Sequence, residues 1–252
     1  MAKTERILGV AFFAGDAAEA VAGVEASGGC VLIPASPALT KLRYDSAYRA
    51  ALESADYVLP DSGLLVSLWR ALGGKSLAKI SRIAYLRELL GSQSFRSANV
   101  VWIVGSTAEK KRALAFFSGS AMSMRDEHFF VREQGSAGIH DHELLLAIEH
   151  RKPEHIVVAL RSGRAEELAV YLRDYVLSRP RIHCVGAGLG FLTGSERAIP
   201  EVLERRQLGW VARFIAQPRL IIPRLAIAST VAAMIIRYRS EMPPLQSRWS
   251  DL

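Results

Sequence analysis

Short apolar runs alternate with longer segments of helical pattern along this 252-residue chain. Apolar runs of four to seven residues bounded by turn residues indicate buried strands, and apolar positions at helical spacing indicate helices that cover a sheet. The predicted strands are 7–13, 30–34, 57–60, 99–104, 129–132, 156–160 and 182–185, and the predicted helices are 17–26, 37–54, 64–72, 83–90, 108–117, 142–150 and 165–177. This alternation predicts an α/β fold with a Rossmann-like, mostly parallel sheet and helices on both faces. Asp16 and Asp141 are expected to cap the helices that follow them.

The pattern changes after residue 200, where aliphatic and aromatic residues alternate with arginines. Pro218 and Pro223 fall inside this region, which predicts several short helical pieces and not one straight helix. The apolar run 225–236 is too short to cross a bilayer, which takes about 20 residues, but it is long enough to lie in the membrane surface. We therefore predict an α/β core, 1–200, and a helical, membrane-associating appendage, 201–252. An ordinary C-terminal helix packed on the core fits the composition equally well.

Composition narrows the choice of partners. The formal charge of +7 and the isoelectric point near 9.6 favour anionic partners, which include nucleotide phosphates, nucleic acid and an acidic membrane surface. The two cysteines, Cys30 and Cys184, lie in apolar strands and provide no disulfide framework, as expected in a reducing cytoplasm. The N-terminus lacks the layout of a signal peptide, and no apolar run reaches 18 residues.

Several polar and glycine positions follow predicted strands, where α/β proteins place their functional sites. Asp61 follows the strand 57–60 and is a candidate general base. Gly105, Gly186 and Gly188 lie in turns whose backbone N–H groups suit a diphosphate. The histidines near Asp141, which are His140, His142 and His150, are of metal-binding type but lack a metal-binding spacing, so we predict no metal site.

The segment from Gly194 to Arg224 resembles the C-terminal signature of the WecG/TagA/CpsF glycosyltransferase family. That signature runs approximately G-x-x-x-R-A-P, a spacer, L-E-W-x-x-R, and then E-P-x-R-x-x-x-R. The matching residues here are Gly194, Arg197, Ala198, Pro200, Leu208, Trp210, Arg213, Pro218, Arg219 and Arg224. The stretch ADYVLPD at 55–61 is similar to the family's A-D-x-V-x-x-D-G, and the order of elements from 99 to 190 is like the family's second half.

The resemblance implies an inverting glycosyltransferase that needs neither a metal nor another cofactor. It would move a sugar from a nucleotide diphosphate, such as a UDP-linked N-acetylmannosamine-type sugar or hexose, to a polyprenyl-diphosphate-linked saccharide. The product would enter envelope or exopolysaccharide biosynthesis, with the enzyme peripheral on the inner face of the cytoplasmic membrane. The implied roles are Asp61 as general base, Lys79, Arg82, Gly105, Gly186, Gly188 and Arg197 at the donor, and Trp210, Arg213, Arg219 and Arg224 at the acceptor pyrophosphate and membrane.

The chain departs from the family pattern at several positions. Ile33-Pro34-Ala35 stands where the family has Thr-Pro-Asn, Lys79 replaces an arginine, Arg82 a glycine, and Ala165 a glutamine. These changes leave open a degenerate member that binds a nucleotide sugar or glycolipid without turnover. The net charge leaves open a basic nucleic-acid-binding α/β protein, but no recognition motif supports it and no nucleic-acid partner is predicted.

Overall fold

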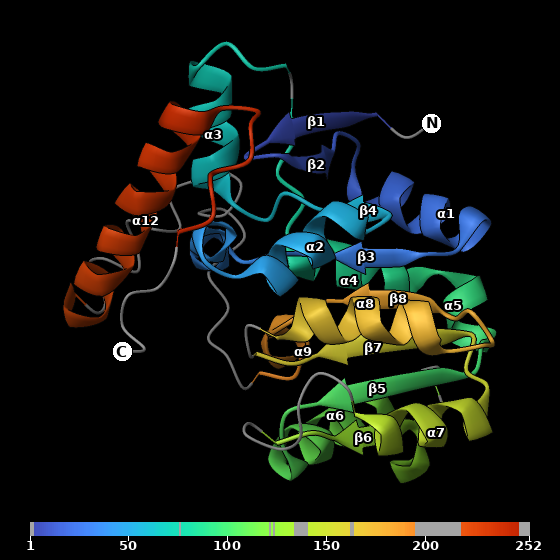
Figure 1. Cartoon of the computed structure of the whole chain (residues 1–252). Coiled ribbons are helices and arrows are strands. Elements are labelled where there is room, and N and C mark those ends of the chain that lie inside the picture. The colour runs from blue at the N-terminus through green and yellow to red at the C-terminus, as the bar shows by residue number, and fades with distance from the viewer. Residues whose placement is uncertain are drawn as a thin grey trace, which may run out of the picture.

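The computed structural model describes residues 3–75, 77–120, 122, 124–133, 141–161, 164–194 and 218–246. Within these residues the chain forms one eight-stranded sheet in the order β1-β2-β4-β3-β8-β7-β5-β6 (Figure 1). Only the β1–β2 pairing is antiparallel, and all other neighbouring strands of this sheet are parallel. The strands are β1 Thr4–Ile7, β2 Val10–Phe13, β3 Cys30–Leu32, β4 Tyr57–Val58, β5 Val100–Val104, β6 Phe129–Val131, β7 His155–Ala159 and β8 Arg181–Cys184. The predicted α/β class with a mostly parallel sheet is confirmed.

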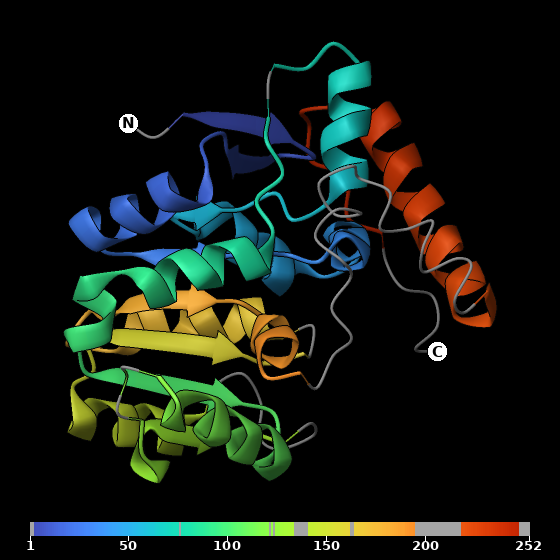
Figure 2. The same ribbon diagram turned by 180° about the vertical axis from the view of Figure 1, so that it is seen from behind.

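Helices cover both faces of the sheet, as predicted. The helical elements are α1 Ala17–Ser27, η1 Ser36–Arg43, α2 Ser46–Ser54, α3 Gly63–Ala71, α4 Arg82–Gly91, α5 Gln93–Ser97, α6 Thr107–Ser118, η2 Asp126–His128, α7 His142–Arg151, α8 Ala165–Tyr175, α9 Gly188–Leu192 and α12 Pro218–Tyr238. Helices α2, α7 and α8 pack on the face seen in Figure 1, and α1, α4, α5, α6 and α9 on the face seen in Figure 2. Each face of the sheet carries a hydrophobic core, and strand β5 contributes side chains to both. Val101 and Ile103 point to one face, and Val100, Trp102 and Val104 point to the other.

The first predicted strand, 7–13, is wrong in detail, because it covers the end of β1, a turn and β2, which form an antiparallel hairpin over residues 4–13. Leu8 and Gly9 form its two-residue turn with positive φ angles of 51° and 80°, as a tight turn that matches the twist of the strands requires. The hydrophobic pattern does not reveal this turn, because Leu8 is apolar and fully buried and therefore continues the apolar run of the strands. Its backbone N–H groups donate to the carbonyls of Arg239 and Ser240, at 2.7 and 3.0 Å, so the C-terminal region covers it.

The predicted helix 37–54 is also two elements, the 3₁₀-helix η1 and the α-helix α2. Tyr44 and Asp45 separate them, and the Asp45 carboxylate accepts a hydrogen bond from the backbone N–H of Tyr48 at 3.0 Å. This cap starts a new helix inside a continuous amphipathic pattern. The predicted caps Asp16 and Asp141 are confirmed, since each carboxylate accepts a bond from the N–H three residues later, at 2.8 and 2.9 Å.

Helix α12 runs without a break from Pro218 to Tyr238, so the predicted break at Pro223 is wrong, while the pieces predicted before Pro218 lie outside the described residues. Pro218 is the first helical residue, where no intrahelical N–H bond is needed, and Pro223 removes a single bond near that end. The second half of the helix packs against η1 and α3, with Val231, Met234 and Ile235 buried in the main core (Figure 1). Three residues of the apolar run 225–236 therefore serve the core.

The chain after α12 is attached to the same region. Arg43 donates through Nη2 to Oε1 of Gln246 at 2.6 Å, and Arg49 donates to the carbonyl of Pro243. Among the residues described, no helix combines the length and the hydropathy needed to cross a membrane. The division at residue 200 stays a prediction, but residues 227–246 are held by the α/β core.

Candidate active site

Four of the parallel strands end at one edge of the sheet and deliver the candidate residues there. Asp61 follows β4, Gly105 follows β5, Arg161 follows β7 and Gly186 follows β8. Because carboxyl ends of parallel strands meet at the same edge, residues from the two halves of the chain come together. The candidate site is this edge, between the ends of β4 and β5.

Asp61 and Arg82 form an ion pair at the β4 end of this edge. Nε of Arg82 donates to Oδ2 of Asp61 at 2.7 Å, and the backbone N–H of Arg82 points to Oδ1 at 3.3 Å. Arg82 is the first residue of α4, whose N-cap is Ser81. The start of one helix therefore presents a backbone donor and a guanidinium to the same carboxylate. Both side chains are mostly buried, with 17% of Asp61 and 15% of Arg82 exposed.

Arg82 also reaches the glycine turn after β8. A Cβ atom on Gly186 would lie 3.0 Å from Nη1 of Arg82, and a Cβ atom on Gly188 would lie 3.5 Å from its Cγ. Gly186 has a φ of 54°, which favours glycine on backbone grounds as well. The two glycines therefore let the arginine lie against the turn, and three of the residues predicted at the donor are adjacent in space.

Lys79 lies beside the turn that holds Asp61. A Cβ atom on Gly63 would be 4.0 Å from Cδ of Lys79. The backbone N–H of Ile80 donates to the carbonyl of Pro60 at 3.0 Å, which keeps this segment alongside the Asp61 turn. The structure thus gathers Asp61, Lys79, Arg82, Gly186 and Gly188 at one corner of the sheet edge.

Gly105 lies farther along the edge, and its backbone amide already has a partner. Its N–H donates to Oε2 of Glu109 at 2.9 Å, while Oε1 of Glu109 accepts from Nε of Arg161 at 3.1 Å. The sequence reasoning missed Glu109. The Ser106-x-x-Glu109 spacing at the start of α6 is the signal that would have found it, because such a glutamate often reaches back to the residues before its helix.

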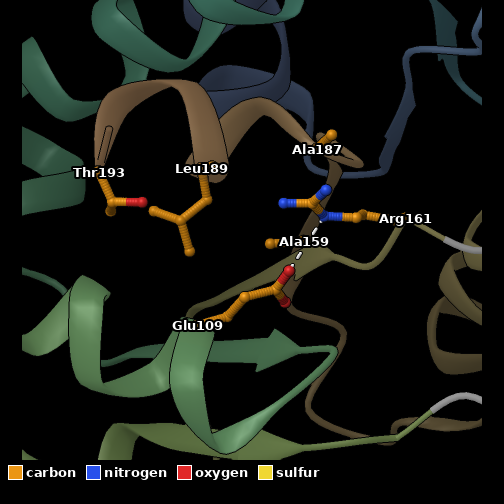
Figure 3. A pocket seen from close by; sticks show the side chains of 7 residues that line it. Glu109, Ala159, Arg161, Ala187, Leu189 and Thr193 are labelled. Carbon is orange, nitrogen blue, oxygen red and sulfur yellow. Dashed lines mark hydrogen bonds and ion pairs between the residues drawn. The ribbon is translucent and has the colours of Figure 1, made fainter. Parts of the chain in front are cut away.

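The Glu109–Arg161 pair borders a hollow at the edge (Figure 3). Its cavity volume is about 10 Å³, which is far below the volume of about 300–1,000 Å³ found in pockets that enclose ligands of drug size. The lining residues are Glu109, Ala159, Arg161, Ala187, Leu189, Gly190 and Thr193. Apart from the Glu109 carboxylate, the Arg161 guanidinium and the Thr193 hydroxyl the lining is apolar, and the hollow is too small to enclose a ligand.

Glu166 is a second carboxylate that sequence reasoning missed. It is 7% exposed at the start of α8, and its Oε2 has no hydrogen-bond partner among the residues described. Burial raises the pKa of Glu166, while its own backbone N–H and the charges of Lys41 and Arg82 oppose that change. A glutamate in the first turn of a helix is usually exposed, so only the tertiary structure shows that this one is buried near Arg82.

The remaining predicted site residues belong to the C-terminal region. Arg197, Trp210 and Arg213 lie outside the described residues, and Arg219 and Arg224 lie in the part of α12 for which only the backbone is described. In the described ranges, no three His, Cys, Asp or Glu residues are grouped as a metal site requires. Cys30 and Cys184 are buried as expected, and burial raises the pKa of both thiols.

Comparisons with known proteins identify the group to which this architecture is similar. The family model described as "Glycosyl transferase WecG/TagA/CpsF family" matches residues 5–243. A curated protein of Bacillus spizizenii, N-acetylglucosaminyldiphosphoundecaprenol N-acetyl-beta-D-mannosaminyltransferase, is 26% identical over 230 residues. That alignment covers 86% of this chain and 82% of the relative, so the similarity extends through both halves of the sheet and into the C-terminal region.

Proposed function

This chain belongs to the WecG/TagA/CpsF family of glycosyltransferases, and from that premise we propose that it moves a sugar from a nucleotide diphosphate to a lipid-linked saccharide. It is a glycosyltransferase, which sets aside the nucleic-acid-binding alternative. The observation that carries the proposal is the contact of Asp61 with Arg82, and of Arg82 with the Gly186 turn. A carboxylate that can accept a proton and a guanidinium that can stabilise a leaving diphosphate therefore lie side by side.

The chemistry follows from these two groups. The acceptor hydroxyl attacks the anomeric carbon while the bond from that carbon to the diphosphate oxygen breaks, which inverts the configuration in a single displacement. Asp61 takes the hydroxyl proton, because each of its oxygens keeps a lone pair beyond the bond it receives from Arg82. Arg82, Lys79 and the backbone N–H groups of the Gly186 turn stabilise the negative charge that develops on the leaving diphosphate.

The relative's printed name supplies the substrate classes of the proposal. It acts on N-acetylglucosaminyldiphosphoundecaprenol, so we propose a polyprenyl-diphosphate-linked acceptor here and a UDP-linked hexose or N-acetylmannosamine-type donor. A lipid-linked acceptor implies work at a membrane surface, for which we propose the inner face of the cytoplasmic membrane. Arg219 and Arg224, in the first half of α12, would face anionic lipid and the acceptor pyrophosphate. The product would enter an envelope or exopolysaccharide pathway, with no metal required.

The substitution Asp61→Asn tests the proposed mechanism. It keeps the size of the side chain and removes the proton acceptor, so we expect turnover to fall about 10²- to 10⁴-fold while donor binding is largely kept. Transfer to a lipid-linked acceptor and calorimetric binding of UDP are the two measurements. Asp126→Asn is the matched control, because that carboxylate is 77% exposed and distant in the fold from β4. Near-normal turnover of Asp61→Asn would remove Asp61 from the mechanism.

A member that binds substrates without turnover remains the second candidate. Ile33 and Ala165, which replace a threonine and a glutamine of the family pattern, are each 2% exposed. Apolar packing has therefore replaced polar groups at two positions beside the site. Nucleotide-sugar binding with no transfer to any lipid-linked saccharide would favour this candidate, whereas measurable transfer that needs Asp61 would exclude it.

A further inference from the structure

Glu166 is a buried carboxylate in the first turn of α8 that the mechanism above does not use. Its side chain is 7% exposed, and its Oε2 has no hydrogen-bond partner among the residues described. An ionised carboxylate is unfavourable in such a place unless nearby cations compensate its charge. We propose, on the basis of the proposed function, that Glu166 acts through Arg82 and weakens the binding of a nucleoside diphosphate there. When the diphosphate binds, the Glu166 carboxylate takes up a proton from solvent.

The position of Glu166 relative to Arg82 follows from the ends of β7 and β8. A Cβ atom on Gly186 would lie 3.0 Å from Nη1 of Arg82 and 3.7 Å from the carbonyl oxygen of Leu160, so the guanidinium lies where both strands end. Helix α8 begins a few residues after Leu160. Burial raises the pKa of the Cys184 thiol on β8, and the charge of Glu166 raises it further while that of Arg82 lowers it. The guanidinium and the second carboxylate are therefore neighbours in a mostly buried region, where charges interact strongly.

The surroundings of Glu166 suit a carboxyl group that gains a proton. Burial raises its pKa, while its own backbone N–H and the charges of Lys41 and Arg82 oppose that change and the charge of Glu167 adds to it. Charged and titratable side chains reach it from five elements, and they are Lys41 of η1, Tyr48 of α2, Arg82 of α4, Cys184 of β8 and Glu167 of α8. A diphosphate at Arg82 reduces the positive charge that this arginine presents to Glu166, and its own negative charge favours the protonated carboxyl.

A negative charge behind Arg82 has a consequence for turnover. After transfer the nucleoside diphosphate keeps the groups that bound Arg82, Lys79 and the Gly186 turn, and it carries more negative charge than the donor did. Holding it tightly would slow its release without stabilising the transition state. The Glu166 carboxylate repels the product more than the donor, because the product carries the larger charge, and it therefore favours release.

A purely structural role for Glu166 predicts a different outcome. A negative charge in the first turn of a helix stabilises that helix, and the Glu166 carboxylate also accepts a hydrogen bond from its own backbone N–H. In that case Glu166→Gln would change the melting temperature and leave the affinity for nucleotides as it is. The two roles therefore differ in what happens to binding when the charge is removed.

Isothermal titration calorimetry of the full chain with UDP separates them. Glu166→Gln keeps the size of the side chain and removes its charge, so we expect it to bind UDP about 5- to 30-fold more tightly than the wild type at pH 8. This difference should shrink as the pH falls to 5, because the wild-type carboxyl then carries a proton with or without UDP. Titrations in two buffers of different ionisation enthalpy should show that the wild type takes up more protons than the variant. In the transfer assay the variant should have a lower kcat, a lower KM and stronger inhibition by UDP.

Glu167→Gln is the matched control, because Glu167 is the next residue and is also 7% exposed. Burial raises the pKa of Glu167 too, but the charges that act on it are those of Asp45, Lys41 and Arg164 and not that of Arg82. We expect this control to keep the wild-type affinity for UDP at each pH.

Equal or weaker UDP binding by Glu166→Gln at pH 8 would overturn the inference and leave the proposed transfer reaction intact. If this variant does not fold, the wild-type protein alone decides, and the absence of proton uptake beyond the ionisation of UDP itself would overturn the inference. No binding of UDP to the wild-type protein would overturn both the inference and the proposed donor.

Discussion

A buried chain of hydrogen bonds that joins β7, β8 and α4 predicts that the protein loses stability in mild acid. Nδ1 of His155 lies 2.9 Å from Nε2 of His183, and Nδ1 of His183 lies 2.7 Å from the Tyr85 hydroxyl. Both imidazoles are fully buried, and their rings stack with centroids 5.2 Å apart. A neutral ring has one N–H donor and one acceptor nitrogen, so His183 can bond to His155 and Tyr85 through both nitrogens while it is neutral, whereas Nε2 of His155 has no hydrogen-bond partner among the described residues. A proton on either ring would set two N–H groups against each other or leave one without an acceptor.

The magnitude follows from the pKa values. Burial, with a smaller effect of Arg181 that Glu154 opposes, lowers the pKa of His155 from 6.5 to about 4. Burial and the neighbouring His155 and Arg181 lower the pKa of His183 in the same direction. Between pH 6.5 and 4 the unfolded chain binds a proton on His155 that the folded protein does not. The free energy of unfolding therefore falls by up to about 1.4 kcal/mol for each pH unit, or by about 3 kcal/mol in total from His155 alone. His183 adds to this loss.

Urea unfolding at pH 6.5, 5.5 and 4.5, followed by circular dichroism, measures the loss. The triple variant Tyr85→Phe, His155→Leu, His183→Leu removes the hydrogen-bonding groups together and replaces them by apolar groups of similar size. Its free energy of unfolding should fall less steeply with acid than that of the wild type, by at least about 1 kcal/mol per pH unit. His150→Gln is the control, because His150 is exposed, and it should keep the wild-type slope. An equal slope in the triple variant and the wild type would refute the assignment of acid sensitivity to these imidazoles.

Three further predictions concern the edge of the sheet and α12. Arg82→Lys keeps a positive charge but loses the planar guanidinium that contacts both Asp61 and the Gly186 turn, so the rate of sugar transfer should fall about 10- to 100-fold. The control Arg96→Lys on α5 should leave the rate unchanged, and equal rates in the two variants would contradict the role of Arg82. A chain that ends before α12 loses three buried side chains, each of which contributes about 2–4 kcal/mol to the free energy of unfolding. We expect this truncated chain to be insoluble, or unfolded when measured by circular dichroism. A soluble, folded product would show that α12 is a separable appendage. The full-length variant Arg219→Glu, Arg224→Glu should therefore be used to test membrane contact: we expect weaker, salt-sensitive flotation with anionic vesicles at an unchanged melting temperature, and flotation equal to wild type would count against the proposed contact.

The class of fold, and the residues proposed for the candidate site, could be predicted from signals that are local in the sequence. Apolar strand runs and helical spacing are local signals, so β5, β7, β8 and the helices between them could be placed from residue order alone. The caps Asp16 and Asp141 were readable because a cap bonds within three residues of itself. Asp61 and the turn at Gly186 could be named as candidates because α/β sheets place functional residues after their strands. The family was recognised from spacing along the chain.

Which of these residues meet depends on the arrangement of the folded chain. Arg82 pairs with Asp61 across 21 residues, Arg161 with Glu109 across 52, and His183 with Tyr85 across 98. The order of strands in the sheet sets these pairings, and hydrophobic periodicity carries no information about that order. The same reason explains α12, whose apolar residues fit a membrane surface or a protein core equally well by composition. Packing against η1 and α3 assigned Val231, Met234 and Ile235 to the core, because burial depends on neighbours that are distant in sequence.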